Sequence, residues 1–81
     1  MDEDLRKAVH DLDVTVWVGK SGLEPVVDEF ADQLVEHELV KVKFLRAARG
    51  GTSTEELAAD LAERADAELI ETRGNTATFR R

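Results

Sequence analysis

The sequence predicts a single α/β domain whose four-stranded mixed sheet carries its helices mainly on one face. Apolar residues recur in turn at the two-residue spacing of a strand and at the three-to-four-residue spacing of a helix. Glycine-containing segments separate some of these stretches, at 19–22, 50–51 and 74. A chain of 81 residues suits one small domain, which we expect to cover residues 1–81. The predicted order is an N-terminal helix followed by β-α-β-α-β-β.

The first half of the chain predicts a helix, a strand and a second helix. Residues 4–12 have the spacing of a short amphipathic helix, which Asp2 or Asp4 can cap. Valines alternate with polar or aromatic residues over 14–18, so a strand with its valines in the core turns Trp17 outward. Pro25 suits the first position of a helix over about 24–37.

The next segment predicts a basic strand and a glycine-rich connection. Over residues 39–46, apolar side chains alternate with Lys41 and Lys43, which therefore face outward. Residues 47–52 contain two consecutive glycines and are expected to form a flexible connection. Right-handed crossovers then place both long helices on one face and leave the other face, with Trp17 and the two lysines, open.

The last third predicts a helix and a hairpin. Ser53 and Glu56 have the spacing of a capping box, and the helix that they begin is expected to end near residue 65 or 66. Strands over 67–73 and 76–80 flank Gly74-Asn75, which is typical of a tight turn.

The loop after the first strand, Gly19-Lys20-Ser21-Gly22, is a candidate phosphate-binding turn. Its glycines let a nucleic-acid backbone approach closely, Lys20 adds positive charge, and unpaired N–H groups at the following helix start favour an anion. The spacing alone is weak, because a G-x-x-G arises by chance about 0.4 times in a chain of this length. A loop that grips an RNA backbone and a purely structural turn both remain open.

The net charge of −7 argues against nucleic-acid binding until its distribution is considered. Residues 1–38 carry eleven acids and three bases, whereas residues 39–81 carry seven acids and eight bases. Four bases and no acid lie between Leu39 and Gly50, and they are Lys41, Lys43, Arg46 and Arg49. The acidic excess of the whole chain, with four lysines against seven arginines, is typical of a protein from a high-salt cytoplasm.

Several classes of protein are not expected. The chain has no cysteine, no apolar run long enough to cross a bilayer, and an acidic start where a secretory signal would be basic, so we expect a cytoplasmic protein. His10 and His37 have no second metal ligand at suitable spacing. No catalytic constellation is visible, so neither an enzyme, a metal site nor a cofactor is predicted.

Several stretches together resemble the CRM domain of the YhbY-like RNA-binding family. They are the Gly19–Gly22 loop before an acidic helix, the strand over 38–43, a further helix, and a closing strand pair around 73–76. The resemblance runs from about Leu5 to Arg81. Asn75 and Arg80 stand about where the family usually carries a basic residue and an aromatic one.

The resemblance implies a domain that binds structured RNA, with stand-alone bacterial and archaeal members associated with precursor ribosomal RNA of the large subunit. The chain is thus identified as an archaeal, halophilic, stand-alone member that acts as a monomer in ribosome assembly. The residues expected to bind RNA are Gly19, Lys20, Ser21, Gly22, Trp17, Lys41, Lys43, Arg46, Arg49, Arg73 and Arg80.

Alternatives remain open for several of these residues. Trp17 can stack on a base or pack beneath the N-terminal helix or a chain end. Lys41 and Lys43 can contact phosphates or serve only to discourage pairing at a sheet edge. For the whole protein, the alternative is an interaction module whose acidic helices dock a basic partner such as a ribosomal protein.

Overall fold

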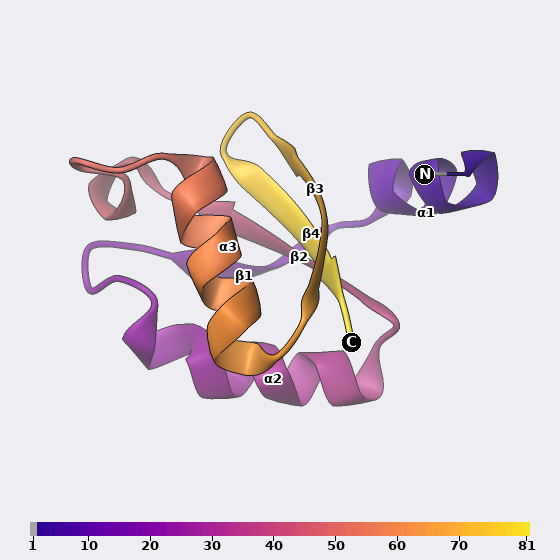
Figure 1. Ribbon diagram of the computed structural model, residues 1–81, viewed down its shortest axis with the longest axis horizontal. Helices are drawn as coiled ribbons and strands as arrows, with labels where there is room; N and C mark the ends of the chain where they lie inside the picture. The colour runs from indigo at the N-terminus through magenta and orange to yellow at the C-terminus, as the bar shows by residue number, and fades with distance from the viewer. Residues whose placement is uncertain (1) are drawn as a thin grey trace.

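The computed structural model describes residues 2–81, so Met1 of the expected domain lies outside the described residues (Figure 1). The order of elements is the predicted one, with short 3-10 turns before α2 and after β2. The bounds are α1 (Glu3–Asp11), β1 (Val14–Val18), a 3-10 turn (Glu24–Val26), α2 (Val27–Glu36), β2 (Leu39–Phe44), a second 3-10 turn (Arg46–Ala48), α3 (Thr54–Ala65), β3 (Glu68–Arg73) and β4 (Thr76–Arg80).

The four strands form one mixed sheet in the order β1-β2-β4-β3. β1 and β2 run parallel, whereas β4 pairs antiparallel with both β2 and β3. The predicted fold class is therefore confirmed. In this order the two parallel strands lie side by side and the C-terminal hairpin extends the sheet, so β1 and β3 are its edges.

One face of the sheet packs against α2 and α3 and forms the core (Figure 1). The alternation read from the sequence holds in β1, β2 and β4, where the residues expected to face inward are buried, except that Val14 is half-buried next to a register shift in β1. Phe30 of α2 meets Phe79 of β4 edge to face, with ring centroids 4.8 Å apart and planes at 75°. The buried strand residues are Val16, Val18, Val40, Val42, Phe44, Ala77 and Phe79.

Two element ends differ from the prediction by more than one residue. The helix expected over 24–37 begins as a 3-10 turn, and α2 proper starts only at Val27. Pro25 suits this turn because it has no N–H to donate, while the N–H of Val26 bonds to the carbonyl oxygen of Leu23. The strand expected over 39–46 ends at Phe44, because Arg46 enters the second 3-10 turn.

The connection over 47–52, expected to be flexible, is held by hydrogen bonds. The N–H groups of Ala48 and Arg49 bond to carbonyl oxygens three residues earlier, and the N–H of Thr52 bonds to the carbonyl oxygen of Arg49 at 3.1 Å. These bonds place residues 46–48 in a short 3-10 turn and Gly50 and Gly51 in a hydrogen-bonded turn. The flexibility expected from the glycine pair stays a prediction.

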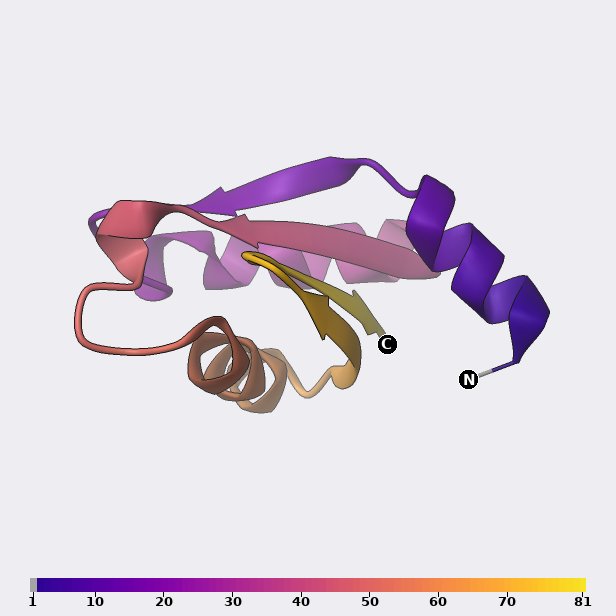
Figure 2. The ribbon, with the colours of Figure 1, turned by 90° about the horizontal axis from the view of Figure 1, so that it is seen from above.

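The second face of the sheet is only partly open, contrary to the sequence prediction. α1 lies on the other side of the strands from α2 (Figures 1 and 2), and residues of α1 line hollows together with Leu39, Glu71 and Arg80 of the sheet. Thr78, which the alternation places on this face, is 1% exposed, and Val9 of α1 is also 1% exposed. The spacing of residues within α1 does not show where the helix docks. The sequence therefore does not reveal that α1 covers part of the second face of the sheet.

The start of α3 is capped by two side chains. The hydroxyl oxygen of Ser53 accepts the N–H of Glu56 at 3.1 Å, as the capping box predicts. The carboxylate of Glu56 accepts the hydroxyl of Thr52 at 2.6 Å. The cap therefore joins the helix to the connection that precedes it.

The Ser53→Ala variant is expected to lower the free energy of unfolding by about 1 kcal/mol, because one N–H of the first turn of α3 loses its acceptor. Urea denaturation followed by circular dichroism measures this change. Ser21→Ala, in an exposed loop, is the control and is expected to change stability by less than about 0.5 kcal/mol. Equal stability of the two variants would contradict the role of the cap.

Candidate nucleic-acid interface

The Gly19–Gly22 loop is a tight turn at the end of β1. The N–H of Gly22 donates to the carbonyl oxygen of Gly19 at 3.0 Å, and Gly22 has a φ of 79°. A side chain at Gly22 would be strained in this left-handed conformation. Lys20 and Ser21 are exposed at the tip. The turn thus presents Lys20 and the backbone of the loop at the corner of the molecule where β1 ends.

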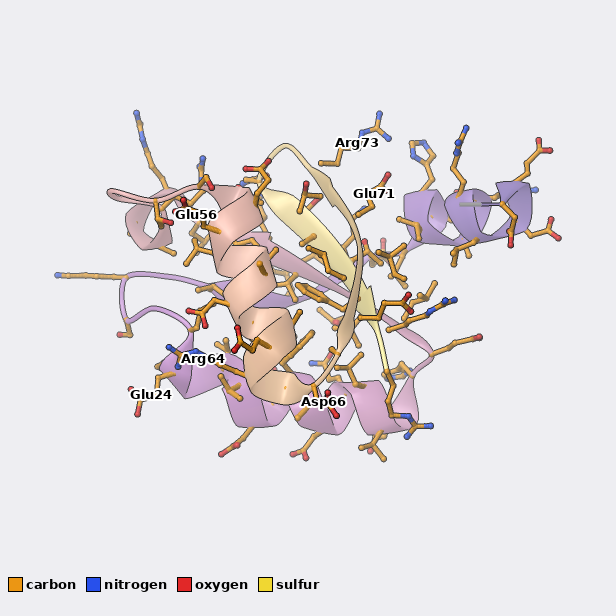
Figure 3. All side chains as sticks on the ribbon, viewed as in Figure 1. Glu24, Glu56, Arg64, Asp66, Glu71 and Arg73 are labelled. Atoms are coloured by element: carbon orange, nitrogen blue, oxygen red, sulfur yellow. The ribbon has the colours of Figure 1, made fainter. Side chains whose placement is uncertain are left out.

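The start of α2 contributes less to this corner than the sequence predicts. A 3-10 turn separates the loop from α2, and Val26 caps the helix without a side-chain hydrogen bond. Glu24 lies in that turn (Figure 3), and the first turn of α2 carries two further acids. Because these carboxylates offset the positive end of the helix dipole, Lys20 and the loop backbone are left as the groups that attract an anion.

A second loop, which follows β2, lies beside the first. The N–H of Leu45 donates to the carbonyl oxygen of Val18 at 2.8 Å, so β2 ends next to the start of the glycine loop. Arg49 donates its Nε–H to the carbonyl oxygen of Phe44 at 3.1 Å and is half-buried. Arg46 is exposed in the intervening turn. Arg46 is therefore available to a ligand, whereas part of the Arg49 guanidinium holds the loop.

The β3–β4 turn is the third loop at this edge. The carbonyl oxygen of Asn75 accepts the N–H of Phe44 at 2.8 Å, and Gly74 adopts a φ of 59° in the turn. The Gly19–Gly22 loop, the 45–52 loop and the Gly74-Asn75 turn therefore all lie at the end of the sheet where β1 and β2 finish (Figure 2). We refer to these three segments as the loop edge.

A row of cross-strand neighbours runs across the second face beside the loop edge. Trp17 of β1 pairs with Lys43 of β2, Lys43 with Thr76 of β4, and Thr76 with Arg73 of β3. The row crosses three gaps between neighbouring strands. Each gap is about 4.8 Å wide, so the row is about 14 Å long. The side chain of Trp17 is 53% exposed, so it is not packed beneath α1 or a chain end. We call these four residues the transverse row.

Two of the predicted site residues lie apart from both the loop edge and the transverse row. Lys41 is half-buried one step along β2, opposite Thr78. Arg80 is at the far end of β4, where it pairs with Glu68 across the hairpin. The hydrogen bond and the charge of Glu68 raise the pKa of Arg80, so this guanidinium is already held by an acid.

The pattern of residues also matches a known family over the described chain. A model of the CRS1 / YhbY (CRM) domain family matches residues 2–81. The chain belongs to the CRM domain family. The resemblance noted from the sequence is therefore confirmed.

Two relatives of this CRM domain show how widely its sequence and fold recur. A probable RNA-binding protein of Methanocaldococcus jannaschii is 41% identical over 79 residues, which are 98% of this chain and 59% of that protein. The solution structure of a hypothetical Staphylococcus aureus protein, described as a proposed RNA-binding protein, superposes with a TM-score of 0.77 at 30% identity. That match covers 96% of this chain and 80% of the other. The chain thus spans about three fifths of the archaeal relative.

Metal binding and membrane spanning were two further possibilities for the described part of this CRM domain. No group of three or more histidine or acidic side chains within residues 2–81 is placed to hold a metal ion. None of the helices over the same residues has the length and apolar character needed to cross a membrane.

Sequence reasoning missed the basic side of α1 in this CRM domain. Arg6, Lys7 and His10 lie next to Arg73, and Nδ1 of His10 is 3.2 Å from an NH1 of that arginine. The helical spacing showed that these side chains share the polar side of α1, but it carried no information about a neighbour sixty residues away. Leu45 is exposed beside Gly19, on the outward face that the alternation gives it, but it was not among the predicted site residues.

Proposed function

We propose that this CRM domain binds structured RNA at the loop edge and along the transverse row. The observation that carries the proposal is the gathering of Lys20, Lys43, Arg46 and Arg73 with an exposed tryptophan on one edge of a chain whose net charge is −7. Such a local excess of positive charge supports phosphate binding. The names of both relatives point to the same ligand class.

The mode of binding follows from the shape of the surface. Lys20 and the loop backbone approach one phosphate, and Lys43 and Arg46 approach the next ones along the chain of the RNA. Lysine and arginine contacts to phosphates position the RNA without reading its bases, so shape governs recognition. The proposed role is binding rather than catalysis.

The finer proposal is that the RNA is precursor ribosomal RNA of the large subunit and that the domain acts as a monomer during ribosome assembly in the cytoplasm. The family resemblance supports it. Crosslinking in cells followed by sequencing of bound RNA is the test, and the Lys20→Glu variant is the control. We expect reads enriched in large-subunit precursor sequences, with the enrichment lost in the control. Reads that only follow RNA abundance would contradict the ribosomal target.

A second candidate function uses the outer side of α2. Its exposed acids are Asp28, Glu29, Asp32 and Glu36. These acids favour a basic protein partner, such as a ribosomal protein. Pull-down with ribosomal proteins separates the two functions: neutralising the acids should abolish capture under this second function, and Lys20→Glu should leave it intact.

Trp17 provides a direct optical test of stacking because it is the one tryptophan in the sequence. We expect RNA to quench its fluorescence, and we expect Trp17→Ala to weaken binding by about 1 to 3 kcal/mol, which is about 5- to 150-fold. Trp17→Phe should retain part of this affinity because it keeps a ring. Since the side chain is 53% exposed, stability should change little. Unchanged affinity of the alanine variant would rule out stacking.

A further inference from the structure

A groove of about 450 Å³ lies between α1 and the hairpin strand β3, outside the surface described so far. Its volume is within the range of small-molecule sites. Glu71 and Arg73 project from β3 on the side that faces α1 (Figure 3). The lining residues are Glu3, Arg6, Lys7, His10, Glu71 and Arg73.

Positive charge enters this groove from both walls. Arg6 and Lys7 come from α1, and Arg73 comes from β3. NH1 of Arg73 lies 3.2 Å from Nδ1 of His10, and a guanidinium can only donate hydrogen bonds, so this nitrogen of His10 is the acceptor in the contact. This contact holds Arg73 beside α1, where an anion in the groove would meet cations from two elements.

The groove is continuous with the proposed RNA-binding surface. Arg73 is the last member of the transverse row, which begins at Trp17 on the opposite edge of the sheet. An RNA backbone that leaves the Gly19–Gly22 loop and follows the row reaches the groove after about 14 Å. Arg73 therefore belongs to both surfaces and joins them.

The two carboxylates in the groove favour a nucleotide over a free anion. Glu3 and Glu71 only accept hydrogen bonds when ionised, so they repel a bare phosphate but suit hydroxyl and amino donors. A ribonucleotide carries both kinds of group, because its phosphate accepts while its 2′-hydroxyl and base amino groups donate. The mixed lining matches that combination.

We propose that the α1–β3 groove is a nucleotide subsite that extends the RNA interface from the loop edge onto α1. This inference rests on the proposed RNA-binding function. Arg6, Lys7 and Arg73 hold the phosphate, and Glu71 accepts from the ribose or the base. The RNA thus crosses the second face of the sheet rather than touching the loop edge alone.

Titration of an RNA hairpin with a single-stranded extension tests the groove. Arg6→Gln with Lys7→Gln should weaken binding about tenfold and lower the slope of log affinity against log salt by about two. Arg64→Gln with Arg81→Gln is the control, because it removes two positive charges elsewhere; Arg64 lies on α3, on the other side of the sheet (Figure 3). The control should change the slope by much less than one.

A second measurement locates the RNA on the unmodified protein. Adding the same hairpin should shift the backbone amide resonances of residues 6–10 and of Arg73. The subsite requires both results, so an absent shift, or a slope equal to that of the control, would overturn it. If Lys20→Glu with Lys43→Glu still abolishes binding, the failure concerns the groove alone; if that variant also binds normally, the proposed function fails with it.

Discussion

Replacing Lys20 and Lys43 together by glutamate is expected to reduce the affinity for structured RNA by at least about 100-fold. A charged hydrogen bond contributes about 1.5 to 3 kcal/mol, so the loss of two phosphate contacts removes about 3 kcal/mol or more before the new repulsion is counted. Both side chains lie outside the core, so the fold should persist. Fluorescence anisotropy with a labelled RNA hairpin at fixed salt measures the affinity.

A variant of equal net charge separates a specific interface from general repulsion. Arg64→Glu with Arg81→Glu makes the same change in net charge away from the loop edge and the transverse row. We expect it to weaken binding less than tenfold, since exposed charges farther than about 10 Å are largely screened at 0.1 M salt. If the two double variants lose affinity equally, binding depends on net charge, and the interface proposed above is wrong.

The substitution Phe79→Ala is expected to lower the free energy of unfolding by about 3 to 5 kcal/mol. Phe79 is fully buried on β4, and its ring meets that of Phe30 at 4.8 Å between centroids. A domain of this length has roughly 4 to 12 kcal/mol of stability in all, so the variant should lose at least about a quarter of it. Urea denaturation followed by circular dichroism and by Trp17 fluorescence measures the loss.

Val35→Ala is the matched control for this core substitution. Val35 is also apolar and lies on α2, but its side chain is 67% exposed. Its removal should change the free energy of unfolding by less than about 0.5 kcal/mol. A loss at Phe79 no larger than that at Val35 would mean that the contact between α2 and β4 does not form the core.

Local alternation was enough to predict much of the fold and part of the site. Trp17 and Lys43 were expected on the same outward face because each alternates with buried valines, and the structure pairs them directly. The joining of β1 and β2 by one crossover implies that both loops after these strands lie at the same edge of the sheet. Lys20 and Arg46 are brought together there by topology that the sequence already indicates.

The relation between Arg73 and Arg80 shows what local patterns do not reveal. The two arginines are seven residues apart in the chain, yet the hairpin places one at the loop edge and the other beside Glu68 at the opposite end of the sheet. The register of β3 and β4 alone determines where these two arginines lie. The docking of α1 on the second face depends equally on contacts between distant segments, so neither the burial of Thr78 nor the α1–β3 groove follows from spacing.

Hydrogen bonds between the three loops determine which substitutions the loop edge can accept. Main-chain bonds join Leu45 to Val18 and Phe44 to Asn75, and they do not depend on which side chains these residues carry. Side chains at the loop edge can therefore be exchanged while the positions of the loops are kept. A library that varies positions 20, 46 and 75 should yield folded variants with new RNA preferences, which makes the domain a scaffold for selecting RNA binders.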